Sequence, residues 1–145
     1  TLAFSQQVLG GIATHEERWA DAEMHFASAL RWAMEGDGER RGSILHERAH
    51  LRLRRRERAG PSEGDLDAVG ADLEAAESLL RAAEAIRELL PALCVRARFL
   101  RLRGDPASAE VLLEEVEEGI RQQGWDGDAV LEGLLEEARR GPNDT

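Results

Sequence analysis

The segment His46-Glu47-Arg48-Ala49-His50 has the residue types and spacing of a zinc-protease motif. On a helix, histidines four positions apart lie on one face and can bind one zinc ion, with the glutamate as general base. In such motifs the residues between and after the ligands are mostly uncharged, whereas this chain has Arg48 and Arg52 there. A zinc-dependent hydrolase is therefore only a distant alternative. We expect no catalytic residues, and we expect no bound metal or cofactor.

A cluster of arginines surrounds this motif. Residues 39–58 contain eight Arg and three Glu, although the whole chain of 145 residues has a net charge of −10. Arginine binds carboxylates and phosphates through paired hydrogen bonds, so one interpretation is an anion site. The other interpretation is a solvated helix face whose charges pair with one another. We expect no nucleic-acid binding, because the acidic remainder repels phosphate and no aromatic residues are interleaved with the arginines.

Cysteine content and hydropathy indicate the cellular compartment in which the chain is expected. The only cysteine, Cys94, excludes an internal disulfide and is typical of a reducing compartment, so we expect a cytoplasmic protein. No apolar run approaches the roughly 20 residues that a membrane span requires, so we expect no membrane partner.

All the segments that carry these residues are predicted to be helices. Hydrophobic residues make up 42% of the chain and aromatic residues only 4%, and no alternating strand pattern is present. Spacings of three and four between apolar residues, with Gly and Pro between segments, predict helices. We expect them at residues 2–14, 16–34, 44–59, 65–89, 91–103, 106–123 and 128–140, with a loop at 35–43 that Ser43 ends as a helix cap. The predicted core contains Phe26, Leu79, Leu93, Ala97, Leu100, Leu113, Val116 and Ile120.

Two stretches of the chain carry the same pattern 34 residues apart. The matched pairs are Gly70 with Gly104, Ala75 with Ala109, Leu79 with Leu113, Ala82 with Val116, and Ile86 with Ile120. A fixed period of this size indicates an array in which each unit is a pair of helices. A turn glycine, a small residue five later, a large apolar residue four beyond and a small one three beyond resemble the tetratricopeptide repeat (TPR) family. Residues 22–29 repeat the small–large–small part of this pattern, although Glu17 occupies the place of the turn glycine.

This resemblance implies one domain over residues 1–141, built as a short TPR-like α-solenoid. Antiparallel helix pairs would form repeats at about 2–34, 43–89 and 90–123, followed by a capping helix at 128–140. Residues 142–145 would be a disordered tail. The spacing from Ala22 to Ala75 exceeds the 34-residue period, so the middle repeat needs longer helices or loops.

The resemblance also implies a non-catalytic module that binds a protein or peptide in a concave groove lined by the first helix of each pair. Similar arrays occur in bacterial signalling proteins and transcription regulators, so a domain that senses a small effector is the alternative. Two helical stripes are expected to form a basic groove floor for an acidic partner: Arg48, Arg52, Arg55, Cys94, Arg98 and Arg101.

Overall fold

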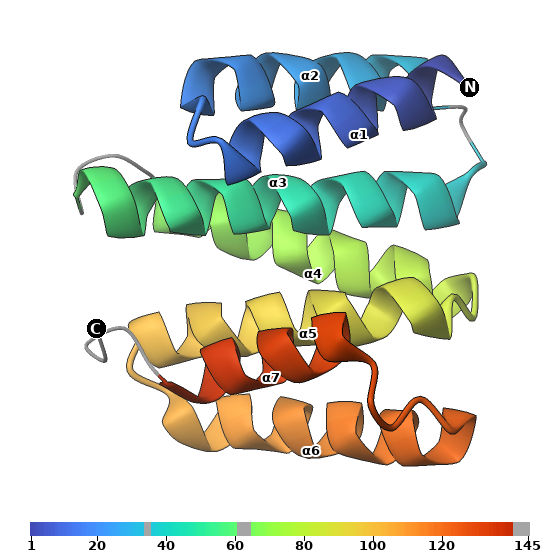
Figure 1. Ribbon diagram of the computed structural model, residues 1–145, viewed down its shortest axis with the longest axis vertical. Coiled ribbons are helices and arrows are strands. Elements are labelled where there is room, and N and C mark those ends of the chain that lie inside the picture. Colours follow the sequence, from blue (N-terminus) through green and yellow to red (C-terminus); the bar gives the residue numbers. More distant parts are fainter. Residues whose placement is uncertain (34–35, 61–64, 141–145) are drawn as a thin grey trace.

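The structure, a computed structural model, describes residues 1–33, 36–60 and 65–140. These described residues form seven helices and no strand, which confirms the all-α fold. Three successive pairs of antiparallel helices follow one another along the long axis, and the last helix packs against the fifth (Figure 1). The helices are α1 (Leu2–His15), α2 (Trp19–Trp32), α3 (Gly38–Ala59), α4 (Leu66–Ala82), α5 (Ile86–Leu102), α6 (Pro106–Gln123) and α7 (Ala129–Arg140).

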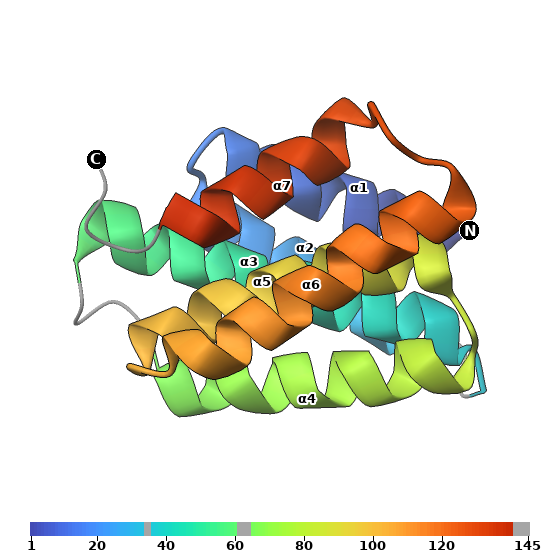
Figure 2. The same ribbon diagram turned by 90° about the horizontal axis from the view of Figure 1, so that it is seen from below.

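The first helix of each later pair also packs on the pair before it. Helix α3 contacts both α1 and α2, and α5 contacts both α3 and α4. Seen along the stack, α1 and α7 lie toward one side of the molecule and α4 lies toward the other (Figure 2). No helix among the described residues has the length and apolar composition needed to cross a membrane.

The second helices of the three pairs bury stripes with the same spacing, which shows how the pairs correspond. The step from the stripe of α4 to that of α6 is 40 residues (109 − 69), so the 34-residue alignment of these helices is wrong. Ala75 and Ala82 are exposed and Leu79 is half-buried, because a second stripe of α4 with similar spacing faces the neighbouring helices instead. The buried stripes are Ala22, Phe26, Ala29 and Ala33; Val69, Leu73, Ala76 and Leu80; and Ala109, Leu113, Val116 and Ile120.

The middle pair begins earlier than the sequence predicted. Helix α3 starts at Gly38, where the Asp37 side chain accepts a hydrogen bond from the Arg40 amide, so Ser43 lies inside the helix rather than at its cap. A Cβ atom at Gly42 would lie 2.8 Å from the Leu80 side chain. This close contact packs the early turns of α3 against the end of α4, which makes a loop there unfavourable.

The predicted helix over 65–89 is in fact two helices. Helix α4 ends at Ala82 and α5 begins at Ile86, so Pro91 lies within α5 instead of opening it. Proline removes one backbone hydrogen bond there. The burial of the neighbouring Leu89 and Leu90 in the core favours the helix despite this loss. Residues 61–64, between the helices expected at 44–59 and 65–89, and the expected tail at 142–145 lie outside the described residues.

Three tight turns share one backbone geometry. In the turns that follow α1, α4 and α5, the same pattern of backbone hydrogen bonds recurs over three residues. The central residue has a left-handed conformation in each case: Glu17 (φ 60°), Glu84 (φ 53°) and Gly104 (φ 83°). Glu17 therefore adopts the conformation of the turn glycine that it replaces, a conformation that glycine adopts with less strain.

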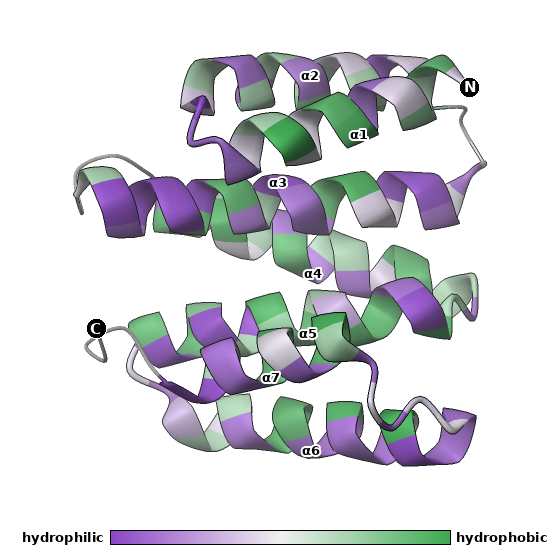
Figure 3. Ribbon diagram, in the orientation of Figure 1, coloured by the Kyte–Doolittle hydropathy of each residue, from purple (hydrophilic) through white to green (hydrophobic). Residues whose placement is uncertain are grey.

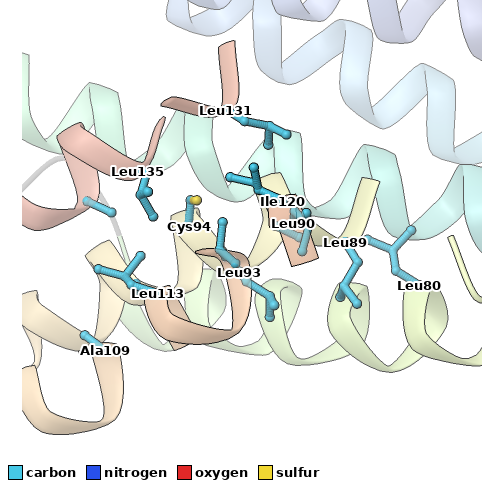
Figure 4. Packing of buried hydrophobic residues seen from close by; sticks show 14 of the residues in the cluster. Leu80, Leu89, Leu90, Leu93, Cys94, Ala109, Leu113, Ile120, Leu131 and Leu135 are labelled. Atoms are coloured by element: carbon cyan, nitrogen blue, oxygen red, sulfur yellow. The ribbon is translucent and has the colours of Figure 1, made fainter. Parts of the chain in front are cut away.

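Buried side chains form three clusters along the stack. The largest joins α5, α6 and α7, and Figure 4 shows Cys94 there near Leu93, Leu131 and Leu135. One of the other two lies around Phe26 in the first pair, and the other around Leu73 in the middle of the stack. The predicted core residues are buried except Leu79 and Leu100, which are half-buried.

Truncating three leucines distinguishes the two alignments of α4 and α6. Leu113 and Leu73 are fully buried at equivalent places, so Leu113→Ala and Leu73→Ala should each lower the free energy of unfolding by about 2–5 kcal/mol. Leu79→Ala serves as the matched control and should have a smaller effect, because Leu79 is half-buried. Urea unfolding measures all three, and an effect at Leu79 larger than that at Leu73 would restore the 34-residue alignment.

Candidate functional site

Helix α3 is buried on two sides, and this determines where its charged residues lie. Ile44 and Leu51 pack into the cluster of the first pair. Ala49 and Leu53 pack against α4 and α5. The polar residues are therefore divided between two remaining sides, one toward α2 and α4 and one toward α1.

Arg48 and Arg52 lie on the side toward α2 and α4, where they are bound to carboxylates. Arg48 donates two hydrogen bonds to Asp72 of α4, both of 2.8 Å. Arg52 donates two to Glu23 of α2, of 2.9 and 3.2 Å, and a third of 3.2 Å to Asp72. Arg55 is half-buried and also has an interaction partner. These contacts of Arg48 and Arg52 join three helices. The hydrogen-bond donors that they use are not available to bind a partner in a basic groove.

The α5 residues of the predicted groove lie against α7, α3 or α6. Cys94 is only 1% exposed, and burial raises the pKa of its thiol to about 12. Arg98 is 7% exposed; it donates to His50 Nδ1 at 3.2 Å and is paired with Glu57 of α3 and Glu137 of α7. The Arg101 guanidinium lies 3.7 Å from Glu110 of α6.

The predicted arrangement of one shared groove floor is therefore wrong. It combined three residues of α3 with three of α5: Arg48, Arg52, Arg55, Cys94, Arg98 and Arg101. The α3 arginines and the α5 residues lie on different sides of the stack, because apolar contacts on two sides of α3 fix its rotation. In addition, α7 packs over the α5 stripe. Contact of these residues with a partner stays a prediction.

A small pocket opens between α1 and α3 on the other polar side of α3. Its volume is about 230 Å³, and it is lined by Gly11, Thr14, His15, Phe26, Glu47, His50 and Arg54. Glu47, His50 and Arg54 are spaced three and four apart, so they form one stripe of α3. The sequence motifs contained these three residues, but the lining from α1 comes from more than 30 residues earlier, and no sequence signal joins the two helices.

The pocket carboxylate is held by a hydrogen-bonded chain from α1. Gln7 Nε2 donates to Ser43 Oγ at 2.7 Å and to Glu47 Oε2 at 3.0 Å, and Arg40 donates to Gln7 Oε1 at 3.0 Å. Burial raises the pKa of Glu47 to about 7, although the hydrogen bond from Gln7 and the charge of Arg40 oppose this. Glu47 can therefore accept or donate a hydrogen bond near neutral pH.

The two histidines of the zinc-like motif are neutral in the folded chain. Burial lowers the pKa of His46 to about 4. Burial and then the charges of Arg98, Arg54 and His46 lower the pKa of His50 to about 3. Among the described residues, no group of three His, Cys, Asp or Glu side chains is placed to hold a metal ion.

Arg54 differs from the arginines described above in its partners. Within the described part of the chain it forms no ion pair, and its buried Nε atom makes no hydrogen bond. A guanidinium in a pocket beside a neutral histidine and a carboxyl that titrates near pH 7 can bind an anionic or hydrogen-bonding group. The arrangement thus fits recognition of a polar group better than nucleophilic chemistry.

Glu47→Gln should change how stability depends on pH. The pKa of Glu47 in the folded chain is above its ordinary value of 4.5. Below about pH 4.5 the carboxyl is neutral in both the folded and the unfolded chain, so it does not change the stability. As the pH rises through 7, ionising Glu47 destabilises the fold. The increase in the free energy of unfolding of the variant over the wild type should therefore be roughly 1–3 kcal/mol larger at pH 8 than at pH 5. Urea unfolding at the two pH values measures this, with the exposed Glu74→Gln as control. Equal effects at both values would contradict the raised pKa.

Metal removal tests the zinc-like motif directly. We expect the purified chain to contain no stoichiometric zinc, and we expect a chelator to leave its unfolding temperature unchanged. The positive charges of Arg54 and Arg98 beside His50 oppose a dication there. One zinc per chain, with loss of stability after chelation, would show that His46 and His50 bind metal.

Comparison of the chain with protein-family models, with curated proteins and with solved structures finds no match. The candidate function is therefore inferred from the side chains of this chain.

Proposed function

We propose that this chain is a non-catalytic helical module that binds a protein or peptide on the side formed by α1 and α3. The observation that carries the proposal is the pocket containing Arg54, whose charge has no carboxylate partner among the described residues. Arg48, Arg52 and Arg98 are all paired within the chain. A side-chain or C-terminal carboxylate of an acidic partner would supply the missing counter-charge at Arg54.

The stacked pairs support a TPR-like scaffold as the frame for this pocket. The buried stripes of α2, α4 and α6 have the same spacing, and each later pair packs on the one before it. Such stacking leaves the first helices side by side, so that neighbouring helices can present one binding surface. By its resemblance to bacterial repeat proteins, we propose a cytoplasmic regulatory role for the chain.

The size of the pocket bears on the alternative, a domain that senses a small effector. Its volume of about 230 Å³ is below the roughly 300–1,000 Å³ of pockets that enclose a whole small-molecule ligand. A pocket of this size suits one side chain or one chain terminus of a larger partner. A very small carboxylate effector is the form of the alternative that it also accommodates.

Two charge-matched variants on one helix test the proposal. Arg54→Gln should weaken partner binding roughly 10- to 100-fold, because a charge-assisted hydrogen bond contributes about 1.5–3 kcal/mol. Arg41→Gln removes the same charge from α3 outside the pocket and should bind normally. A partner captured from the source cell and identified by mass spectrometry provides the ligand for titration calorimetry at two salt concentrations.

The measurement also has a clear negative outcome. Circular dichroism must first show that both variants keep the helical content and unfolding temperature of the wild type. A partner that binds Arg54→Gln as tightly as it binds Arg41→Gln would show that the pocket is not the binding site.

A further inference from the structure

Helix α1 exposes an apolar face in a chain whose other helices are rich in charge. Five of its large apolar residues are between 42% and 58% exposed: Leu2, Phe4, Val8, Leu9 and Ile12. The helix contains no Asp, Glu, Lys or Arg, although 33% of the whole chain is charged. Figure 3 shows hydrophobic turns of α1 in green, in the pair at one end of the stack. Contiguous apolar surface of this kind on a folded chain marks an interaction site.

The packing of α1 leaves much of this face exposed, although the Arg40 guanidinium of α3 lies over the Phe4 ring, 5.0 Å from its centroid. The helix packs against α2 and α3 through its small and polar residues, among them Ala3, Gln7, Gly10 and Ala13. Helix α7, which packs on α5, exposes charged residues such as Glu132, Glu136 and Arg140 and one large apolar residue, Val130. The first and last helices of the described chain therefore differ: α7 exposes one large apolar residue and α1 exposes five.

The spacing of the exposed residues on α1 is complementary to itself. Leu2, Ser5, Leu9 and Ile12 follow one another at intervals of three, four and three, the spacing of a helix–helix seam. In an antiparallel pair of α1 helices centred at the level of Gln7, Leu2 of one copy lies opposite Ile12 of the other. The same symmetry places the small Ser5 opposite the large Leu9. Alternation of small and large residues across a seam allows two helices to approach closely.

Charge favours a second copy as the occupant of this face. Each chain carries a net charge of −10, so two copies repel each other over most of their surfaces. Helix α1 itself contributes no Asp, Glu, Lys or Arg to this face, and Arg40 lies over Phe4, which is not a seam residue. Two copies can therefore meet along the seam without placing like charges opposite one another. A strongly charged partner would find no counter-charge among the seam residues. A two-fold axis also uses each contact twice, because the same patch serves both copies.

From these observations we infer that two copies of this chain associate through α1, as an antiparallel two-fold dimer with Leu9 near the centre of the interface. None of the seam residues lines the Arg54 pocket, so the inference goes beyond the proposed function and does not depend on it.

Sedimentation equilibrium of the 145-residue chain at about 100 µM tests the inference, since the dimer fraction depends on concentration. The expected mass is twice the chain mass of 16.0 kDa. Leu9→Glu should raise the dissociation constant by more than tenfold by placing two carboxylates at the seam. Val111→Glu, at an exposed residue of α6, adds the same charge elsewhere and should leave the dimer intact. Circular dichroism should show that both variants stay folded, as expected for changes at exposed positions.

Cysteine cross-linking then tests the orientation of the two helices. The double variant Leu2→Cys with Ile12→Cys should form a disulfide-linked dimer under mild oxidation, whereas Leu2→Cys alone should not. The native Cys94 is buried and should not interfere. A monomeric wild type, or a dimer that Leu9→Glu leaves intact, would overturn the interface. Efficient cross-linking by Leu2→Cys alone would overturn the antiparallel arrangement. A monomer that still binds a partner through Arg54 would leave the proposed function unaffected.

Discussion

The burial of α3 on two sides is the constraint on which the rest of this structure depends. Ile44 and Leu51 of this helix join the core of the first pair, while Ala49 and Leu53 join the core between α4 and α5. Removing these side chains from water favours one rotation of the helix strongly, because a different rotation would bury arginines instead. Each charged residue of α3 is thereby assigned to one of the two remaining sides.

The same constraint explains why so many arginines can lie in the middle of an acidic chain. On one side of α3, Arg48 and Arg52 bind carboxylates of α2 and α4 through paired hydrogen bonds. On the other side, Arg98 of α5 meets Glu57 of α3 and Glu137 of α7. Half-buried pairs of this kind add little net stability over an apolar contact, but losing one member leaves a costly unpaired charge. They therefore act mainly by fixing how neighbouring helices are oriented.

The two surfaces proposed for binding arise from what this packing leaves unsatisfied. Arg54 lies in the pocket between α1 and α3 and forms no ion pair with the described chain, and α1 has large apolar residues that are 42–58% exposed. Both features involve α1, but Gly11, Thr14 and His15 line the pocket, whereas Leu2, Leu9 and Ile12 do not. A dimer through Leu9 would leave the pocket residues Thr14 and Arg54 for a separate partner.

Local patterns in the sequence determined the all-α fold, the bounds of α6 and the buried stripe of that helix. Ala109, Leu113, Val116 and Ile120 were recognisable as a buried stripe because a helix repeats every 3.6 residues. The tertiary structure decided the alignment of the repeats. Helix α4 carries one stripe through Leu73 and another through Leu79, and only contact with α3 and α5 determines which of them is buried.

The candidate site depended even more on tertiary structure. The sequence singled out His50 and the arginine cluster that contains Arg54, but it could not show which arginines were already paired, because Asp72 and Glu23 lie on other helices. It also could not join Thr14 to Glu47, since residues so far apart in the chain become neighbours only when the helices pack. Spacing along a helix therefore identified which residues share a face, and the packing of the helices decided what that face meets.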